Sequence, residues 1–505
     1  MKKLFITLAA VVAFAACSDD DEPAQLPAAP TIVLQGGDID QPIEITEEMT
    51  VKVDVKAPGT IAGFTVTIDS PALTEEILQR FGLGKELDLC NPGTMDTALA
   101  NLKFPCGDEV AGQTSVSFDI SALVPMIALI YHETSDHKFT LAVTDAKEQT
   151  TTKTLTFHLT APATLTYNDD ADLWANTATV TAENLPDGAK VQYRVKDGEW
   201  QDAALTEGST YQIAPEWDET QNDAKLAIYD IKAGTGVFAG NTYEVRIAAE
   251  DGQAIGTSIV FNTKVGDTIP NGDMSGWSNS GFDIPNAADA DTFWSSGNNF
   301  MSNTLCTKSE DKYGKSAPAA KLASCKVFGA IFAAGNLFTG DFAMAGLGGT
   351  VSFGRRYAWT ARPSALKLKY AATVGTVDSS SLEEVPSGAE DHARIFVAIV
   401  DWTGQHPVTS SLSSSPTGSW DPEKIDTVDE GKILGYGSFK IPPTEEGAEP
   451  TIEDLEIQIH WYDKEAKPAE GSYSLVISCA CNEYGDYFTG CSTNVMYVDD
   501  FEWAY

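Results

Sequence analysis

The sequence has 505 residues and a formal net charge of -40, with 73 Asp and Glu residues against 33 Lys and Arg residues. This length predicts three or four domains. The charge argues against a nucleic-acid partner and against an electrostatic hold on anionic lipid. It fits an exported protein with neutral or cationic partners.

The N-terminus, residues 1–16, is typical of a bacterial export signal. Two lysines precede an apolar run at 4–14, which is shorter than the roughly 20 residues needed to span a bilayer. Small residues then lead directly into Cys17, which resembles the lipobox of bacterial lipoproteins. The resemblance implies cleavage before Cys17 and its lipidation, palmitate included, as an outer-membrane anchor. An ordinary secretory signal with a chance cysteine is the alternative.

Residues 17–28 are predicted to be a linker. The acidic run 18–22 is too polar to fold, and a proline-rich stretch follows it. The acidic run resembles the sorting signal that sends lipoproteins of glycan-foraging Gram-negative bacteria to the cell surface. A solvated tether without a sorting role is the alternative.

Residues 29–161 are predicted to form a β-sandwich with a helical insertion. Apolar and polar residues alternate at 49–55 and 64–68, as in half-buried strands. Ser70 and Pro71 are placed to begin a helix, and Cys90 and Cys106 bracket the insertion as a candidate disulfide. The segment resembles the immunoglobulin-like modules of surface lipoproteins, which implies a spacer or an adhesion surface.

Residues 162–265 contain further strand patterns, with a hairpin turn at Asp197-Gly198. Tyr243 occupies the place of a corner tyrosine, whose hydroxyl group returns to the backbone. Trp174 and Tyr193 are predicted to be core residues. This region resembles a fibronectin type III domain, and the resemblance implies a spacing role.

Residues 267–505 resemble the putative carbohydrate metabolism domain at the C-terminus of many such lipoproteins. The residues that carry the resemblance include Asn271-Gly272-Asp273, Trp294–Asn298, Ala333–Phe342, Ile395–Thr403, Gly485–Cys491 and Val498–Phe501. The family implies a β jelly roll similar to carbohydrate-binding modules, with a suspected role in sugar recognition. Together with the preceding sandwiches, this makes the expected fold mostly β and multi-domain.

A structural calcium site is predicted where the first and last strands of the jelly roll meet. Those strands are neighbours in this architecture, so Asp273 is expected near Asp499 and Asp500. Calcium takes 6 to 8 oxygen ligands, which carboxylates and carbonyls supply. In the alternative, Asp273 caps a turn and the other two carboxylates face solvent.

Sugar recognition needs aromatic faces and hydrogen-bonding side chains together. The candidates for glycan binding are Arg355, Arg356, Tyr357, Trp359, Arg362 and Trp402, with Trp420 as a further one. For any single tryptophan, core packing is the alternative. The arginines can instead bind an anionic sugar or pair with acidic residues.

The remaining cysteines include two more candidate disulfides, Cys306 with Cys325 and Cys481 with Cys491. Cys479 lies two residues before Cys481 on the same strand face. Removing Cys17 from the total of 8 leaves an odd number, so at least one thiol is free or pairs between molecules.

The sequence contains no serine-nucleophile elbow, zinc-protease motif or phosphate-binding glycine loop. Paired carboxylates, which are all that a glycosidase needs, cannot be assigned among so many acidic residues. Our leading hypothesis is a surface-anchored lipoprotein whose C-terminal jelly roll binds a glycan or polysaccharide. A carbohydrate hydrolase or lyase, and an adhesin or structural surface protein, are the alternatives.

Overall fold

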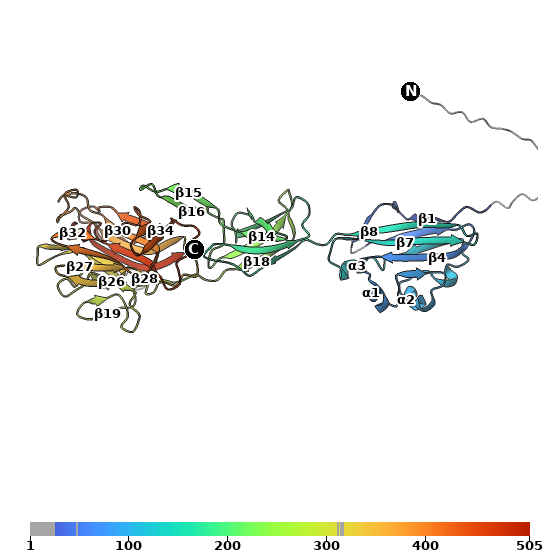
Figure 1. The fold of residues 1–505 in the computed structure, drawn as a ribbon, viewed down its shortest axis with the longest axis horizontal. Coiled ribbons are helices and arrows are strands. Elements are labelled where there is room, and N and C mark those ends of the chain that lie inside the picture. Colours follow the sequence, from blue (N-terminus) through green and yellow to red (C-terminus); the bar gives the residue numbers. More distant parts are fainter. Residues whose placement is uncertain (1–25, 47–48, 311–312, 314–317) are drawn as a thin grey trace, which may run out of the picture. The chain divides into compact units, whose positions relative to one another are not determined.

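The computed structural model describes residues 26–505 except 47–48, 311–312 and 314–317. The predicted signal peptide, Cys17 and the acidic run therefore lie outside the described residues. The chain divides into two compact units, Met1–Pro162 and Ala163–Tyr505 (Figure 1). The predicted mostly β, multi-sheet architecture is confirmed. Within the described ranges, no helix is long and apolar enough to cross a membrane.

The first unit has two sheets packed on one core. One sheet joins β1 (Thr31–Leu34), β3 (Lys52–Lys56) and β6 (Ser115–Asp119). The other has the order β2-β8-β7-β4-β5, with β2 at Ile43–Glu44, β8 at Thr150–Leu159, β7 at Ser135–Asp145, β4 at Ile61–Asp69 and β5 at Glu86–Asp88. Alternate residues such as Val53, Phe64 and Phe139 are buried between them, as the period-two pattern predicts.

Three short helices lie in this unit: α1 (Glu75–Arg80), α2 (Asp96–Asn101) and α3 (Pro125–Ile130). The predicted helix start at Ser70 is wrong. Thr74 is the N-cap of α1, because its side chain accepts from the backbone N–H of Ile77. The Ser70 hydroxyl instead accepts from Leu73 N and pairs with the buried ring of His137 at 2.7 Å.

The second unit begins with two four-stranded sheets. The first joins β9 (Thr164–Tyr167), β10 (Ala178–Glu183), β14 (Thr210–Ile213) and β13 (Ala204–Glu207). The second joins β12 (Gln201–Asp202), β11 (Lys190–Val195), β17 (Thr242–Ala248) and β18 (Ala254–Asn262). Tyr243 is buried, and its hydroxyl accepts a hydrogen bond from Phe238 N at 2.8 Å, as predicted for a corner tyrosine.

The C-terminal region is a sandwich of a large sheet and a five-stranded sheet. The large sheet has the order β15-β16-β36-β34-β30-β37-β26-β27-β31-β32. Its strands are β15 (Trp217–Gln221), β16 (Ala227–Ile231), β36 (His460–Trp461), β34 (Gly431–Ile441), β30 (Ala393–Trp402), β37 (Tyr473–Ala480), β26 (Asn336–Ala345), β27 (Gly348–Phe353), β31 (His406–Ser411) and β32 (Ser414–Thr417). Three short strands pair beside this path: β21 (Trp294–Ser295), β28 (Arg355–Arg356) and β33 (Thr427–Val428).

The five-stranded sheet covers one face of the large sheet. It joins β22 (Cys306–Ser309), β23 (Ala319–Ala323), β38 (Val495–Ala504), β29 (Ala365–Thr373) and β35 (Glu453–Gln458). Two small hairpins complete the region, β19 (Ser278–Asn279) with β20 (Asp283–Ile284) and β24 (Cys325–Val327) with β25 (Ile331–Ala333). The first and last segments are neighbours as predicted, because Phe501 N donates to Gly272 O at 2.8 Å.

The module at 163–265 is fused to the C-terminal sandwich. Its β15–β16 hairpin extends the large sheet, with Tyr229 opposite Trp461. Trp174 packs in the core of the C-terminal region and donates from its indole nitrogen to Ala466 O at 3.0 Å. Through a shared sheet and a shared core, residues 163–505 form one compact unit, which is more than the predicted spacing role requires.

The expected disulfides are not formed: the seven cysteines that the structure describes are free thiols. Cys306, Cys479 and Cys481 are buried in the core of the C-terminal sandwich, and burial raises the pKa of each thiol. The Cys481 thiol donates to Leu322 O at 3.4 Å, while the Cys491 thiol lies 3.3 Å from the Thr493 hydroxyl. The pairs expected from their nearness in sequence, Cys90 with Cys106, Cys306 with Cys325 and Cys481 with Cys491, are therefore wrong.

Candidate functional site

The residues predicted to bind glycan are mostly engaged within the fold. Arg355 forms an ion pair with Asp341 at 2.8 Å and also donates to Phe293 O. Arg356 is exposed and lies 5.1 Å from the ring centre of Tyr473. The Tyr357 hydroxyl donates to Thr268 O at 2.9 Å and accepts from the Trp503 indole. These contacts fix the segment rather than present it to a ligand.

Trp359, Arg362 and Trp402 are buried and cannot contact a sugar from solution. Arg362 is 1% exposed, and its guanidinium carbon lies 4.5 Å from the ring centre of Trp461 and 5.1 Å from that of Trp174. It donates to Trp174 O and Lys464 O, both at 2.7 Å. Burial lowers the pKa of Arg362 to about 10. The cluster fastens the two parts of the second unit together.

The structure places the predicted calcium ligands on the first and last segments of the C-terminal domain. The Asp273 carboxylate caps a turn by accepting from the backbone nitrogen and hydroxyl of Ser275. Asp499 and Asp500 are buried on β38, where Asp499 Oδ1 accepts from Asp500 N at 2.8 Å. Nowhere in the described part of the chain do three or more His, Cys, Asp or Glu side chains form a group that could hold a metal ion. Because backbone carbonyl oxygens also bind calcium, the calcium site at Asp273, Asp499 and Asp500 stays a prediction.

A cleft on the outer face of the large sheet is the candidate site. Its volume is about 270 Å³. We call it the aromatic cleft, because six aromatic side chains are part of its lining: Phe338, Phe342, Phe353, Phe396, Trp420 and Phe488. β26, β27, β30, β31 and β37 form its floor, and the loops after β24, β32 and β37 form its walls.

The cleft exists because the large sheet is apolar on both faces. Along β30, Ile395, Val397 and Ile399 point into the sandwich core. Phe396 and Ala398 point to the other face, where a second cluster includes Trp402 and Val476. An antiparallel strand with one wet face usually alternates apolar and polar residues. The continuous apolar run at 395–400 is therefore the sequence signal for an apolar outer face at this site.

Trp420 forms a wall of the cleft and was a further candidate from the sequence. Its ring centre lies 5.5 Å from Phe396, 5.9 Å from Phe353 and 5.3 Å from Trp402. The buried Trp402 thus supports Trp420 from behind. Trp420 is only partly buried, so part of its surface stays available to a ligand.

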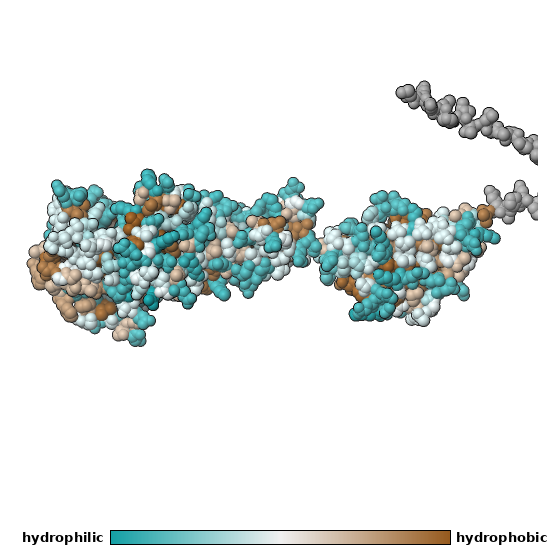
Figure 2. All heavy atoms as spheres, in the orientation of Figure 1, coloured by the Kyte–Doolittle hydropathy of each residue, from teal (hydrophilic) through white to brown (hydrophobic). Residues whose placement is uncertain are grey.

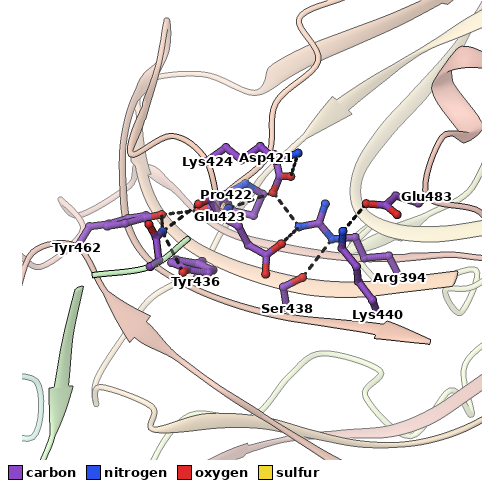
Figure 3. Close-up of polar contacts among 11 residues, drawn as sticks. Arg394, Asp421, Pro422, Glu423, Lys424, Tyr436, Ser438, Lys440, Tyr462 and Glu483 are labelled. Atoms are coloured by element: carbon purple, nitrogen blue, oxygen red, sulfur yellow. Dashed lines mark hydrogen bonds and ion pairs between the residues drawn. The ribbon is translucent and has the colours of Figure 1, made fainter. Parts of the chain in front are cut away.

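The loop that carries Trp420 is held by the ion-pair network of Figure 3. Arg394 donates to Asp421 at 2.7 Å and to Glu423 at 2.9 Å, and also to the Ser438 hydroxyl at 3.1 Å. Asp421 Oδ1 in turn accepts from Glu423 N, which closes a local turn. Arg394 also lines the cleft, so the network forms the floor of its polar end.

The preceding module contributes one residue to this network. Asn222 Nδ2 donates to Glu423 O at 2.9 Å and contacts the hydroxyls of Tyr436 and Tyr462 at 3.2 and 3.1 Å. The Tyr462 hydroxyl donates to Pro422 O at 2.7 Å (Figure 3). The loop is thus fastened from both parts of the second unit.

Two carboxyl groups complete the polar end. Glu483 pairs with Lys440 at 2.6 Å. Asp486 accepts from the Ser419 hydroxyl at 2.8 Å, and burial raises its pKa. The buried carboxylate of Asp391 accepts from Asn482 and Cys491 N, both at 2.6 Å, and so anchors the loop that carries Glu483 and Asp486. The charges lining the cleft therefore all have protein partners.

The opposite end of the cleft is apolar and partly exposed. Phe328 is 78% exposed, Leu347 55% and Met344 42%, and all three line the cleft. Figure 2 shows hydrophobic residues gathered at the end of the domain that carries β26, β27 and β32. Gly348 and Gly349 on β27 leave room here, since a Cβ at Gly349 would overlap the ring of Phe342.

Residues 261–504 match the model of the putative carbohydrate metabolism domain. This match supports the resemblance found in the sequence and shows that the region that holds the cleft is a carbohydrate-related domain. No curated protein matches the chain.

Several solved structures are similar. A putative glycoside hydrolase from Bacteroides thetaiotaomicron is 16% identical, covers 64% of this chain and 98% of its own, and gives a TM-score of 0.32. One from Bacteroides vulgatus is 18% identical, with 48% and 96% covered and a TM-score of 0.30. The Bacteroides ovatus mixed-linkage glucan protein SGBP-B, in complex with a heptasaccharide, is 10% identical, with 90% and 100% covered and a TM-score of 0.15. These scores indicate remote likeness only.

Proposed function

We propose that the C-terminal domain binds a neutral glycan in the aromatic cleft. The observation that carries the proposal is the position of Trp420, held at the wall of an open cleft with several phenylalanine rings on its floor. An aromatic face stacks on the C–H side of a pyranose, while the groups at the polar end bind its hydroxyls. The fixed loop reduces the entropy that binding would otherwise cost.

The charge pattern favours a neutral sugar over an anionic one. Arg394 is shared by Asp421 and Glu423, so its positive charge is already compensated. The whole chain has a net charge of -40, which repels polyanions at long range.

The test is a glycan array probed with the full chain, followed by titration of each retained glycan. Trp420→Ala should weaken binding by about 2 kcal/mol, or roughly thirtyfold, as for other aromatic residues central to an interface. Trp200→Ala is the matched control, because Trp200 packs outside the cleft against Arg194 and Arg246. Equal losses in both variants, or no retained glycan, would contradict the proposal.

A carbohydrate hydrolase or lyase is the second candidate, and Asp486 is the observation that favours it. A partly buried carboxyl whose pKa burial raises is what a general acid needs. The other nearby carboxylates are committed to cations, Glu483 to Lys440 and Asp421 to Arg394. We therefore expect no new reducing ends when the chain is incubated with the retained glycan. Release that Asp486→Asn abolishes would instead establish the enzyme.

We further propose that the protein is anchored in the outer membrane through a lipid on Cys17 and is exposed at the cell surface. The lipobox-like sequence and the acidic run after it support this proposal. In this arrangement the immunoglobulin-like unit at 29–161 is a spacer. Incorporation of labelled palmitate that is lost in Cys17→Ala, and digestion of the protein on intact cells, test the two parts separately.

A further inference from the structure

One end of the aromatic cleft is lined by apolar side chains that a sugar alone would leave uncovered. Besides its phenylalanines, the cleft is lined by aliphatic side chains, among them Met301, Leu305, Val327, Ile331, Met344, Leu347 and Val351. The charged groups of the lining, Arg394, Glu483 and Asp486, form a polar end together with Asn482, and further polar residues such as Asn299 and Asn336 also line the cleft. A pyranose has one apolar patch and many hydroxyls, so it satisfies the polar end but cannot cover the other.

A second observation concerns Phe328 and Phe488. Both have a left-handed backbone, each with φ of +53°, and they are the aromatic residues with this conformation in the described part of the chain. Both line the cleft. This conformation costs free energy for a residue with a bulky side chain, whereas glycine and asparagine adopt it easily.

At Phe328, no packing in the core offsets the free-energy cost of the left-handed backbone. Phe328 lies with Gly329 at the tip of the β24–β25 hairpin, and both have positive φ, as in a turn that normally contains Asn-Gly. Its side chain is 78% exposed, so burial in the core does not offset the strain. Strained residues of this kind cluster at functional sites. A large apolar side chain is therefore held over the cleft where folding alone would favour a small polar one.

Resting on the proposed function, we infer that the glycan carries a hydrocarbon substituent. Its sugar lies at the polar end against Trp420, and its acyl or alkyl arm lies along Phe328, Met344 and Leu347. Two sources supply this chemistry: a soluble polysaccharide that bears ester groups, and the head group of a glycolipid. Arg394 and Glu483 are ion-paired within the protein and Asp486 accepts from the Ser419 hydroxyl, which favours an arm and a sugar that are both neutral.

Calorimetric titration of the full chain with methyl, butyl and hexyl β-D-glucopyranoside, and with the matching galactosides, tests the arm. Each methylene that leaves water should tighten binding by about fourfold until the chain passes the rim. If the affinity does not change with the length of the alkyl chain for either sugar, the inference is overturned. If 1-hexanol binds as tightly as the hexyl glycosides, the sugar contributes nothing and the proposed function fails instead.

Phe328→Asn is the sharpest variant because asparagine tolerates the left-handed turn. In this variant the affinity for alkyl glycosides should depend much less on the length of the alkyl chain, while the affinity for the methyl glycoside stays unchanged. The melting temperature of the second unit should rise. Phe300→Asn is the matched control, since Phe300 is 91% exposed in the same domain and does not line the cleft. If the folded Phe328→Asn variant shows the same change of affinity with alkyl chain length as the unmodified protein, the inference is overturned.

Two further ligands distinguish the sources. One is cellotetraose esterified with butyrate, and the other is a phosphatidylcholine vesicle that contains glucosyl diacylglycerol. Tighter binding of the ester than of plain cellotetraose assigns a substituted polysaccharide, and retention on the glycolipid vesicle but not on plain vesicles assigns a glycolipid. If neither is preferred to its unsubstituted counterpart, the inference is wrong.

Discussion

Two aromatic clusters in the second unit look alike in composition and differ in use. The cluster around Arg362 combines a guanidinium with Trp174 and Trp461, and it is closed to solvent. The aromatic cleft also has an arginine, Arg394, beside Phe396 and Trp420, yet it is open. Tryptophan next to arginine therefore does not identify a ligand site.

The number of layers that cover each cluster explains the difference. The Arg362 cluster lies where the preceding module packs on the sandwich, so polypeptide covers it on each side. The cleft lies on the face of the large sheet opposite the five-stranded sheet, and only loops border it. An apolar sheet face without a covering layer is a site for a ligand.

The largest expected effect concerns the closed cluster. Arg362→Ala should destabilise the second unit by about 3 to 5 kcal/mol. It leaves a cavity and removes the donor from the carbonyl groups of Trp174 and Lys464. Denaturant unfolding followed by tryptophan fluorescence measures this unit alone, since all 10 tryptophans lie after residue 163. Arg356→Ala in the same segment is the control and should change stability by less than about 1 kcal/mol. Equal effects of the two variants would erase the distinction between the clusters.

A smaller effect should link the preceding module to the open cleft. Asn222→Ala removes the hydrogen bond to Glu423 O and the contacts to Tyr436 and Tyr462, at a cost of about 1 to 3 kcal/mol in stability. The loop that carries Trp420 should then exchange its amide hydrogens faster, and affinity for the retained glycan should fall by up to about tenfold.

Asn168→Ala is the control for this prediction, because Asn168 hydrogen-bonds Thr179 within the same module and away from the cleft. Faster exchange in residues 419–426 should appear only in Asn222→Ala. Unchanged exchange and affinity there would mean that the module is a spacer and nothing more.

The strands and the core of this fold could be predicted from the sequence because alternation is a local property. Val53, Tyr193 and Tyr243 are buried as expected. The role of Arg362 could not be predicted, since its partner Trp174 lies 188 residues away along the chain. Trp420 could be listed but not ranked above Trp402, because only the three-dimensional stacking shows that one covers the other.

A pH effect should appear where the β15–β16 hairpin joins the sandwich. His460 Nδ1 lies 2.8 Å from Asp230 Oδ1, and this hydrogen bond raises the pKa of His460 above its usual value of about 6.5. A raised folded pKa means that the stabilisation is complete below the unfolded pKa and is lost as pH rises through the folded pKa. The side chains are 36% and 39% exposed, so the effect should stay below about 1 kcal/mol.

The measurement for this pair is stability from tryptophan fluorescence between about pH 5.5 and about pH 8.5, which spans the range in which histidine titrates. His460→Gln should remove the decline that the pair contributes toward alkaline pH. His158→Gln is the control, because His158 pairs with Asp136 in the first unit, which has no tryptophan. A decline that persists in His460→Gln would assign the pH dependence to another group.

The smallest expected effect is that of removing calcium. A ligand bound at a hundred times its dissociation constant stabilises the native state by about 2.7 kcal/mol, so loss of a structural calcium would lower the melting temperature visibly. The Asp273 carboxylate accepts hydrogen bonds from the backbone nitrogen and the hydroxyl of Ser275, as expected if it caps a turn instead of binding calcium. A chelator should therefore leave the melting temperature of the second unit unchanged. If a chelator lowers the melting temperature, added calcium restores it and Asp273→Asn removes the effect, then Asp273 helps to bind a structural calcium ion, as the sequence predicts.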